Sequence, residues 1–216
     1  MSEDPRPQII EVCHLLAERN FTTATGGNIS VRQPDGTFWV TPSHVHKARV
    51  QQEDLIQVNT NGYILNGTQR PSSELFMHLA VYRALPKAGA VIHAHPPYSS
   101  GFAQACQQID TSSSSEAYVI LGPHIPLIPY APPASQELAM IVHQAMEPRH
   151  KVYLLSNHGV IIWGKDLWEA YDCLDTLELF SQSLLVATLL GGPTPLSDEE
   201  LQVLEEKYIS LSVEVE

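Results

Sequence analysis

The 216-residue chain has few positive charges and gathers none of them into a patch. Lysine and arginine number 12 against 24 aspartate and glutamate residues, which gives a formal net charge of −12. Proteins that bind nucleic acid carry a basic patch or stripe, so we expect no nucleic-acid partner. An anionic substrate would have to be held by local hydrogen-bond donors.

Long apolar runs and paired cysteines are also missing. No uninterrupted apolar run approaches the roughly 20 residues of a membrane-spanning helix. The stretch at residues 183–190 is short and is predicted to be the end of a buried helix. The polar first residues lack the apolar core of a signal peptide. Cys13, Cys106 and Cys173 form no C-x-x-C pair, which indicates reduced cysteines. We therefore expect a cytoplasmic protein with no membrane partner.

Nucleotide-binding loops and internal repeats are absent as well. The chain has neither G-x-x-x-x-G-K-[ST] nor G-x-G-x-x-G, so no nucleotide is implied. Hydrophobic residues make up 44% of the chain and charged residues 17%, which fits a globular protein with a sizeable core. Because the length suits one large domain and no linker interrupts it, we predict a single domain over residues 1–216.

Helical and strand patterns alternate along the chain. Apolar residues at helical spacing, with capping residues and Gly or Pro at the ends, predict helices at residues 7–20, from Ser72 or Ser73 onward, 99–107, 135–146, 166–190 and 198–208. Short β-prone runs between turn residues predict strands at residues 29–32, 37–41, 55–59, 63–65, 90–94, 117–121, 127–129, 152–155 and 160–163. This interleaving, with several hairpin-like pairs, predicts an α/β fold: a three-layer αβα sandwich around a mixed, largely antiparallel central sheet.

Three histidines are the most informative residues present. His93 and His95 form an H-x-H motif at the end of an apolar strand, and the period of two places both side chains on one face, about 7 Å apart along the strand. His158 precedes another apolar strand. Three imidazoles with a vacant fourth position are typical of catalytic zinc. The ligand types alone do not distinguish zinc from iron, cobalt or manganese.

A carboxylate and several small polar residues accompany the histidines. Glu74 stands at a predicted helix start, where it either caps the helix or acts as a base beside the metal. Hydroxyls and backbone N–H groups suited to a small phosphate occur in three segments, which contain Thr25, Gly26, Asn28, Ser43, Ser72 and Ser73.

These motifs occur in a characteristic order. Residues 26–28 read GGN, 41–43 read TPS, 71–74 read PSSE, 93–95 read HAH, and 158–159 read HG. The ordered set, which spans nearly the whole chain, resembles the class II aldolase/adducin family. The resemblance implies a zinc-dependent class II aldehyde-lyase and a homotetramer with fourfold symmetry, whose sites lie between subunits.

The resemblance also implies residue roles. His93, His95 and His158 would bind the metal, Glu74 would be the catalytic acid/base, and the phosphate of a sugar phosphate would contact Thr25, Gly26, Asn28, Ser43, Ser72 and Ser73. The expected reaction is the reversible cleavage of a ketose 1-phosphate, similar to fuculose 1-phosphate, into dihydroxyacetone phosphate and an aldehyde. No lysine Schiff base is required.

The chain departs from the family pattern at two places. His44 follows the TPS motif where the family usually has glycine, and a histidine tolerates a positive φ less well. The tyrosine that protonates the leaving aldehyde oxygen in such aldolases has no clear match near residues 112–118. Glu116 lies close to the catalytic glutamate of the related methylthioribulose-phosphate dehydratases, and Tyr118 follows two positions later. Tyr208 resembles a tyrosine that shields the aldolase site, or else is a surface aromatic on the last helix.

Other functions remain open at this stage. A sugar-phosphate dehydratase or a 4-epimerase would use the same metal and similar carbanion chemistry, and Glu116 favours the dehydratase between them. A non-catalytic scaffold module, as in adducin, would keep the fold without the metal. An iron oxygenase built on histidine and carboxylate ligands is a further alternative.

Overall fold

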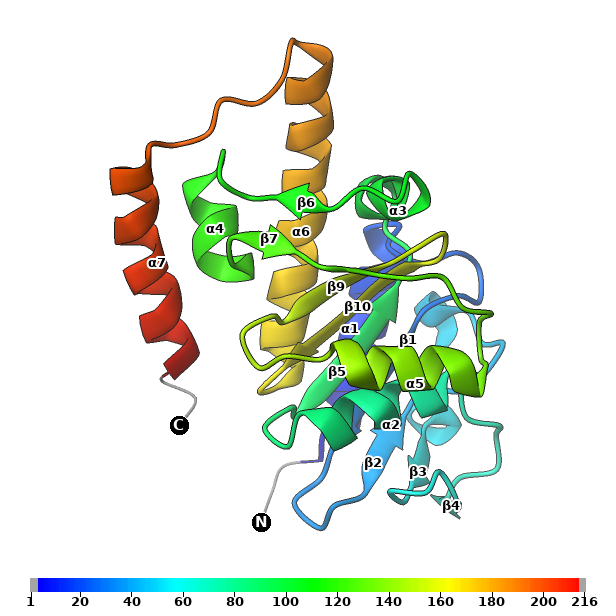
Figure 1. Cartoon of the computed structure of the whole chain (residues 1–216). Coiled ribbons are helices and arrows are strands. Elements are labelled where there is room, and N and C mark those ends of the chain that lie inside the picture. Colours follow the sequence, from blue (N-terminus) through cyan, green and yellow to red (C-terminus); the bar gives the residue numbers. More distant parts are fainter. Residues whose placement is uncertain (1–3, 214–216) are drawn as a thin grey trace.

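The computed structural model describes residues 4–213, and an eight-stranded sheet runs through its centre (Figure 1). The strand order is β4-β3-β2-β1-β5-β10-β9-β8, and every neighbouring pair is antiparallel except β8 with β9. The strands of this sheet are β1 (Asn28–Arg32), β2 (Phe38–Val40), β3 (Ile56–Val58), β4 (Ile64–Asn66), β5 (Ala90–Ala94), β8 (Leu127–Ile128), β9 (Val152–Leu155) and β10 (Gly159–Gly164). The predicted mixed, largely antiparallel sheet is confirmed.

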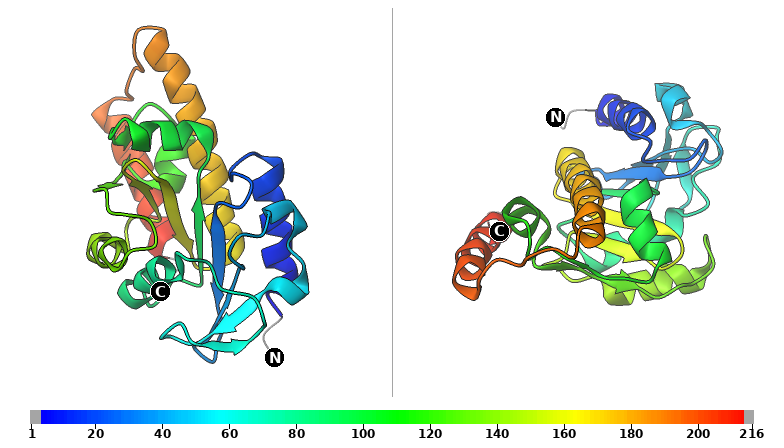
Figure 2. Two further views of the ribbon diagram at one scale, coloured as in Figure 1. Left: turned by 90° about the vertical axis from the view of Figure 1, so that its right-hand side faces the viewer. Right: turned by 90° about the horizontal axis from the view of Figure 1, so that it is seen from above.

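Helices cover both faces of the sheet and make three layers (Figure 1; Figure 2). One face packs against α1 (Arg6–Glu18) and α6 (Leu167–Leu189), and the other packs against α2 (Leu75–Ala84) and α5 (Gln136–Ala145). The remaining helices are α3 (Pro97–Gln104), α4 (Ser115–Leu121) and α7 (Asp198–Val213). The αβα sandwich predicted from the sequence is therefore confirmed. Residues 1–3 and 214–216 of the predicted domain 1–216 lie outside the described residues, and that domain stays a prediction.

The two central strands explain the apolar runs in the sequence. Every residue of β5 and β10 is buried. Strands covered by helices on both faces are apolar at nearly every position rather than at every second one. Ile92 packs toward α1 and α6, whereas Val91 packs toward α2 and α5. His93, fully buried in β5, is a polar exception within these two strands, which points to a specific role for its ring.

The strand predicted at residues 117–121 is wrong, because this segment belongs to helix α4. The hydroxyl of Ser114 accepts a hydrogen bond from the backbone N–H of Ala117, which caps the helix. Gly122 ends it with a φ of 88°, a value that suits glycine. A five-residue apolar run does not distinguish a strand from a short helix. The strands on either side, β6 (Ile109–Asp110) and β7 (His124–Ile125), pair with each other in a small second sheet.

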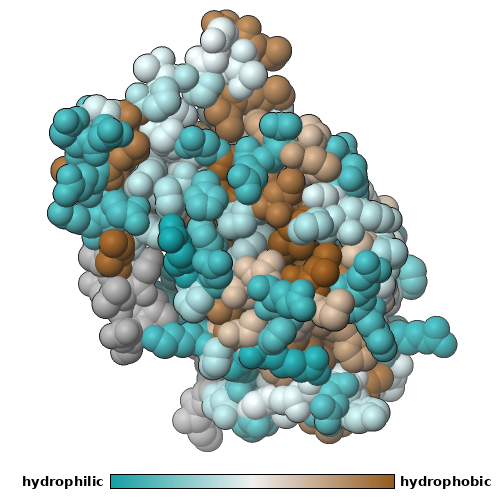
Figure 3. Space-filling view, viewed as in Figure 1, coloured by the Kyte–Doolittle hydropathy of each residue, from teal (hydrophilic) through white to brown (hydrophobic). Residues whose placement is uncertain are grey.

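The prediction that residues 183–190 are the end of a buried helix is right about the helix end and wrong about its burial. The segment does end a helix, α6, but its last turns extend beyond the sheet. Leu189 is 78% exposed and Leu190 is 82% exposed. Brown, hydrophobic atoms accordingly lie at the upper end of α6 in Figure 3. No helix among residues 4–213 is both long and apolar enough to cross a membrane.

Candidate metal centre and active site

Three histidines meet where β5 ends and β10 begins. His93 lies in β5, His95 follows that strand directly, and His158 precedes β10. Because β5 and β10 are antiparallel neighbours, the end of one and the start of the other lie at the same edge of the sheet. One candidate ligand atom from each ring lies within 4.8 Å of the others. The structure therefore brings together the three predicted metal ligands.

Two glycines leave space for the ring of His95. A Cβ atom added to Gly159 would approach the His95 Cδ2 atom to 2.6 Å and the carbonyl oxygen of Ala94 to 2.5 Å. A Cβ atom on Gly26 would approach the Nδ1 atom of His95 to 3.0 Å. Real Cβ atoms do not approach other atoms as closely as the 2.5 and 2.6 Å found at Gly159. Any side chain at position 159 would displace the ring of His95, so the convergence of the three rings requires glycine there.

His93 is oriented by the neighbouring strand. Its Nδ1 atom donates a hydrogen bond to the carbonyl oxygen of Val160 at 2.8 Å, so the neutral ring carries its lone pair on Nε2. A backbone carbonyl that accepts the second ring proton is the usual support of a metal-binding histidine. The register of β5 against β10 thus determines which nitrogen of His93 faces the centre.

Glu74 faces the histidines from the start of α2. Its Oε2 atom lies 3.1 Å from Nε2 of His93, and its Oε1 atom lies 3.2 Å from Nε2 of His158. Nε2 of His93 and Oε1 of Glu74 are both buried without a hydrogen-bond partner. A lone pair and a carboxylate oxygen at these distances repel each other unless a proton or a metal ion lies between them. The three imidazoles and this carboxylate therefore fit a divalent cation.

Burial keeps the site in the form that binds metal. Burial and the nearby charges of His93 and His158 lower the pKa of His95 to about 3, so this ring is neutral near pH 7. Metal ligation requires the neutral imidazole. Burial alone would raise the pKa of Glu74, but the attraction of His93 and His158 outweighs it and holds that pKa well below its usual range. Glu74 is therefore a carboxylate at neutral pH.

Glu74 lies just before the helix and not inside its first turn. It is the N-cap residue of α2, which begins at Leu75. The helix was predicted to be capped by Ser72 or Ser73, and this boundary is wrong by one or two positions. Ser72 still helps to form the turn, because its hydroxyl accepts a hydrogen bond from the backbone N–H of Glu74 at 3.2 Å. The carboxylate is thereby free to point at the histidines.

Two predicted phosphate-binding segments lie side by side. Pro42 and Pro71 form an isolated antiparallel bridge, and the N–H of Ser43 donates to the carbonyl of Arg70 at 2.8 Å. This pairing brings Ser43 close to Ser72 and Ser73, at the turn that leads into Glu74. His44 has a φ of 60°, so the position does require the left-handed conformation that glycine tolerates best. Phosphate binding by these residues stays a prediction.

The third predicted segment, residues 25–28, borders the same centre. Thr25 is exposed, and Gly26 lies against His95. Asn28, however, uses its side chain inside the protein, because its Nδ2 atom donates to Oε2 of Glu74 at 3.1 Å. Its Oδ1 atom contacts His78. Asn28 therefore supports Glu74, and phosphate binding by its side chain stays a prediction.

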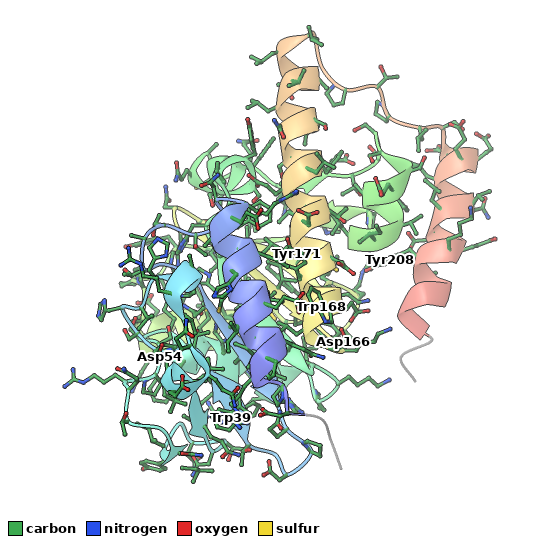
Figure 4. The ribbon with its side chains drawn as sticks, turned by 180° about the vertical axis from the view of Figure 1, so that it is seen from behind. Trp39, Asp54, Asp166, Trp168, Tyr171 and Tyr208 are labelled. Atoms are coloured by element: carbon green, nitrogen blue, oxygen red, sulfur yellow. The ribbon has the colours of Figure 1, made fainter. Side chains whose placement is uncertain are left out.

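The two residues predicted as second acid/base groups, Glu116 and Tyr118, lie in α4. Glu116 lines a hollow of about 500 Å³ beside α6, and the Tyr118 hydroxyl donates to Glu205 of α7 at 3.0 Å. Among residues 4–213, neither makes a described contact with the histidines or Glu74. The hydroxyl of Tyr208 donates to the carbonyl of Arg149, and its ring packs on Gly122, so it is buried on the inner side of α7 (Figure 4).

Two supporting residues escaped the sequence analysis. Lys47 is 1% exposed, its Nζ atom donates to the carbonyl of Val45, and its charge contributes to lowering the pKa of His95. Glu178 of α6 is 6% exposed and accepts hydrogen bonds from the N–H groups of Tyr98 and Ser99 at 2.7 and 2.8 Å. The sequence signal for Glu178 is a carboxylate on the buried face of a long helix, because such a group is seldom buried without a hydrogen-bond partner.

Removing the carboxylate of Glu178 is expected to destabilise the protein. It holds the start of α3, the segment that follows His95, and its loss leaves a buried N–H group and a part-buried one without an acceptor. We expect Glu178→Ala to lower the free energy of unfolding by about 2–4 kcal/mol in urea titrations. The exposed residue Glu11 provides the control, since Glu11→Ala should change it by less than about 0.5 kcal/mol. Equal effects of the two substitutions would contradict this role.

Buried His78 is expected to make stability depend on pH. Burial and the nearby charge of His93 lower the pKa of His78 from 6.5 to about 3. Between pH 6.5 and 3 the His78 ring is protonated in the unfolded chain but not in the folded protein. The contribution of His78 to the free energy of unfolding is therefore complete above pH 6.5 and is lost progressively as the pH falls toward 3. The expected slope is about 1.4 kcal/mol per pH unit. In urea titrations of chelated protein, His78→Gln should show a shallower slope than the wild type by that amount.

The chain is similar to known proteins over nearly its whole length. Residues 7–185 match the family model described as Class II Aldolase and Adducin N-terminal domain. The L-fuculose phosphate aldolase of Escherichia coli (strain K12) is 32% identical over 213 residues, which are 97% of this chain and 96% of that protein. The 5-deoxy-D-ribulose 1-phosphate aldolase of Bacillus thuringiensis serovar kurstaki is 29% identical over 204 residues, 94% of each. A solved L-fuculose 1-phosphate aldolase has a TM-score of 0.86 at 27% identity, covering 96% of this chain and 97% of that one.

Proposed function

The chain belongs to the class II aldolase and adducin family, and we propose that it reversibly cleaves a ketose 1-phosphate into dihydroxyacetone phosphate and an aldehyde. The observation that carries the proposal is the carboxylate of Glu74 beside His93 and His158. A scaffold module has no use for a buried carboxylate that faces imidazole lone pairs, since the arrangement is destabilising without a cation. An enzyme that moves a proton next to a metal ion needs both groups.

His93, His95 and His158 would hold the metal, and we propose that it is zinc. When bound, such an ion supplies Lewis acidity to the substrate oxygens, which stabilises the negative charge that develops as the carbon–carbon bond breaks. The carboxylate of Glu74 can hold a proton on Oε1, which has no hydrogen-bond partner, and deliver it to the carbon released by cleavage. In the synthetic direction Glu74 removes that proton.

The neighbouring polar segments suit the phosphate of the substrate. Ser43, Ser72 and Ser73 lie together at the turn before α2, and Gly26, which follows the exposed Thr25, lies against His95. Neutral hydroxyl and N–H donors bind a phosphate dianion well where they converge. The buried ammonium of Lys47 adds positive charge within reach of His95, which favours an anionic substrate. We propose these residues as the phosphate site.

The aldehyde end of the substrate requires a second proton-transfer group. Glu116 and Tyr118 are the candidates, and both lie in α4 with contacts to other segments of the same chain. A homotetramer with sites between subunits would bring α4 of one subunit to the histidines of another. We propose this assembly, in the cytoplasm, as the working form of the enzyme. A dehydratase remains the alternative because Glu116 is a carboxylate.

Product identification tests the proposal. Zinc-loaded protein is incubated with ketose 1-phosphates of five and six carbons, and released dihydroxyacetone phosphate is measured by coupled reduction. The unphosphorylated ketoses serve as controls and should react much more slowly. A dehydrated diketo phosphate as the product would assign the chain to the dehydratases instead. Turnover that persists after complete chelation would contradict the metal-dependent mechanism.

A further inference from the structure

A continuous line of buried side chains leads from Tyr82 of α2, by way of β1, to Glu74. The Tyr82 hydroxyl lies 2.9 Å from Oγ of Ser30, which lies 2.7 Å from Nδ1 of His78. The Nε2 atom of His78 contacts Oδ1 of Asn28, and Nδ2 of Asn28 lies 3.1 Å from Oε2 of Glu74. Each of these five residues is at most 8% exposed. The line connects β1 with α2 and ends at the candidate acid/base.

The direction of the hydrogen bonds between Ser30 and Glu74 follows from the groups at the Glu74 end. At one end, the carboxylate of Glu74 can only accept, so the amide of Asn28 must point its NH2 group toward Glu74 and its oxygen toward His78. The oxygen of Asn28 requires a donor, which makes Nε2 of His78 the protonated nitrogen. The remaining nitrogen of this neutral ring, Nδ1, then accepts from the hydroxyl of Ser30.

The other end of the line is compatible with this direction. The hydroxyl of Tyr82 donates to the backbone carbonyl of Ser30 at 2.8 Å. Its oxygen also lies 2.9 Å from Oγ of Ser30, a contact in which either hydroxyl can be the donor. From Ser30 onward each bond donates toward Glu74: Ser30 to His78, His78 to Asn28, and Asn28 to Glu74.

We propose that His78 is a positioning residue for catalysis: through Asn28 it holds Oε2 of Glu74 in place and leaves Oε1 to carry the proton. The proposal rests on the proposed function of Glu74. The amide of Asn28 provides the hydrogen bond to Oε2, and Oε1 has none. If His78 could not donate, the oxygen of Asn28 would lose its buried partner, and the amide would be held only by its own bond to Glu74.

Simple packing does not account for the line. His78 lies among Leu75, Leu79 and Tyr82 on the face of α2 that packs on the sheet, where an apolar residue would avoid the desolvation of a ring with two polar nitrogens. A buried polar group is stabilising only when all of its hydrogen bonds are made, and here Ser30 satisfies one ring nitrogen while Asn28, which bonds to Glu74, satisfies the other. The presence of a polar residue at position 78 is thus explained by its hydrogen bonds in the line to Glu74.

Substitutions that separate hydrogen bonding from shape test the proposal. Zinc-loaded His78→Leu should lose about 10–100-fold in kcat, with KM within about twofold of the wild type and a full complement of zinc, because the metal ligands are intact. His78→Gln keeps an N–H group near the position of Nε2 and should recover most of that loss. The control is His143→Gln on α5, outside the site, which should leave kcat unchanged.

The outcomes that overturn the proposal are distinct. A folded His78→Leu protein with wild-type kcat, an equal loss in the leucine and glutamine variants, or a loss explained by missing zinc would each reject it. If the leucine variant does not fold, nitrogen-15 NMR of the wild type decides, since the proposal requires a proton on Nε2 of His78 and none on Nδ1. This measurement does not depend on turnover, so it stands even where no ketose phosphate is cleaved and only the proposed function fails.

Discussion

Replacing His158 by alanine is expected to abolish both metal binding and turnover. The ligand set has three imidazoles within 4.8 Å of one another, and two of them, His93 and His95, come from a single strand end. Only His158 closes the set from the neighbouring strand, so its loss leaves an open pair of ligands. Because a bound metal supplies several kcal/mol of transition-state stabilisation, we expect the turnover rate to fall by about a thousandfold or more.

The measurement pairs metal content with activity. Purified His158→Ala protein should retain less than about a tenth of the zinc of the wild type after dialysis, consistent with the 10–100-fold weakening that smaller changes around such sites produce. The matched control is His124→Ala, which removes an exposed histidine outside the cluster and should keep zinc and activity. A His158→Ala protein that stays fully loaded and active would contradict the assignment of the metal centre.

The second large effect is expected from Glu74→Gln, which should lower kcat by about 10²–10⁴-fold while the metal remains bound. Glutamine has nearly the shape of glutamate and can still accept the hydrogen bond from Asn28. It cannot take up and release a proton at neutral pH. The substitution therefore separates proton transfer from metal binding, which no histidine substitution does.

Zinc content, KM and kcat are measured on the same preparation of Glu74→Gln. We expect full zinc occupancy and a KM within a fewfold of the wild type, because the substitution alters neither the three histidines nor the segments proposed to bind phosphate. The matched control is Glu147→Gln, which changes a carboxylate outside the site and should be silent. Activity of Glu74→Gln within about tenfold of the wild type would assign the proton transfer to another group.

Much of the fold was predictable because its elements carry strong local patterns. β5 is bounded as predicted, since a run that is apolar except for His93 ends at a His-Pro sequence. The segment at residues 117–121 was misassigned, because a short apolar run is compatible with either structure and the cap at Ser114 decided for the helix. The exposure of the last turns of α6 was not predictable for a different reason. An apolar composition does not indicate whether another element covers the segment.

The site divides in the same way. The histidines and Glu74 were predictable from their residue types and order, because few structures other than a metal centre need them together. The hydrogen bond between His78 and Asn28 was not predictable, because the two residues are 50 positions apart and only the packing of α2 on β1 brings them into contact. His44 shows that a motif can change its residue and keep its backbone conformation. With a φ of 60°, His44 adopts the left-handed conformation that suits glycine. For a residue other than glycine this conformation costs about 1–2 kcal/mol.

The strand order has a consequence for how a newly made molecule acquires its ion. Asn28 and Glu74 are 46 positions apart, and His93 hydrogen-bonds to Val160, 67 positions later. During synthesis, a nascent chain that has emerged only as far as His95 presents two of the three histidines, and the third arrives once β10 has closed a long loop against β5. We therefore expect metal capture by this set to be a late step, and its rate in refolding experiments should report the docking of β10.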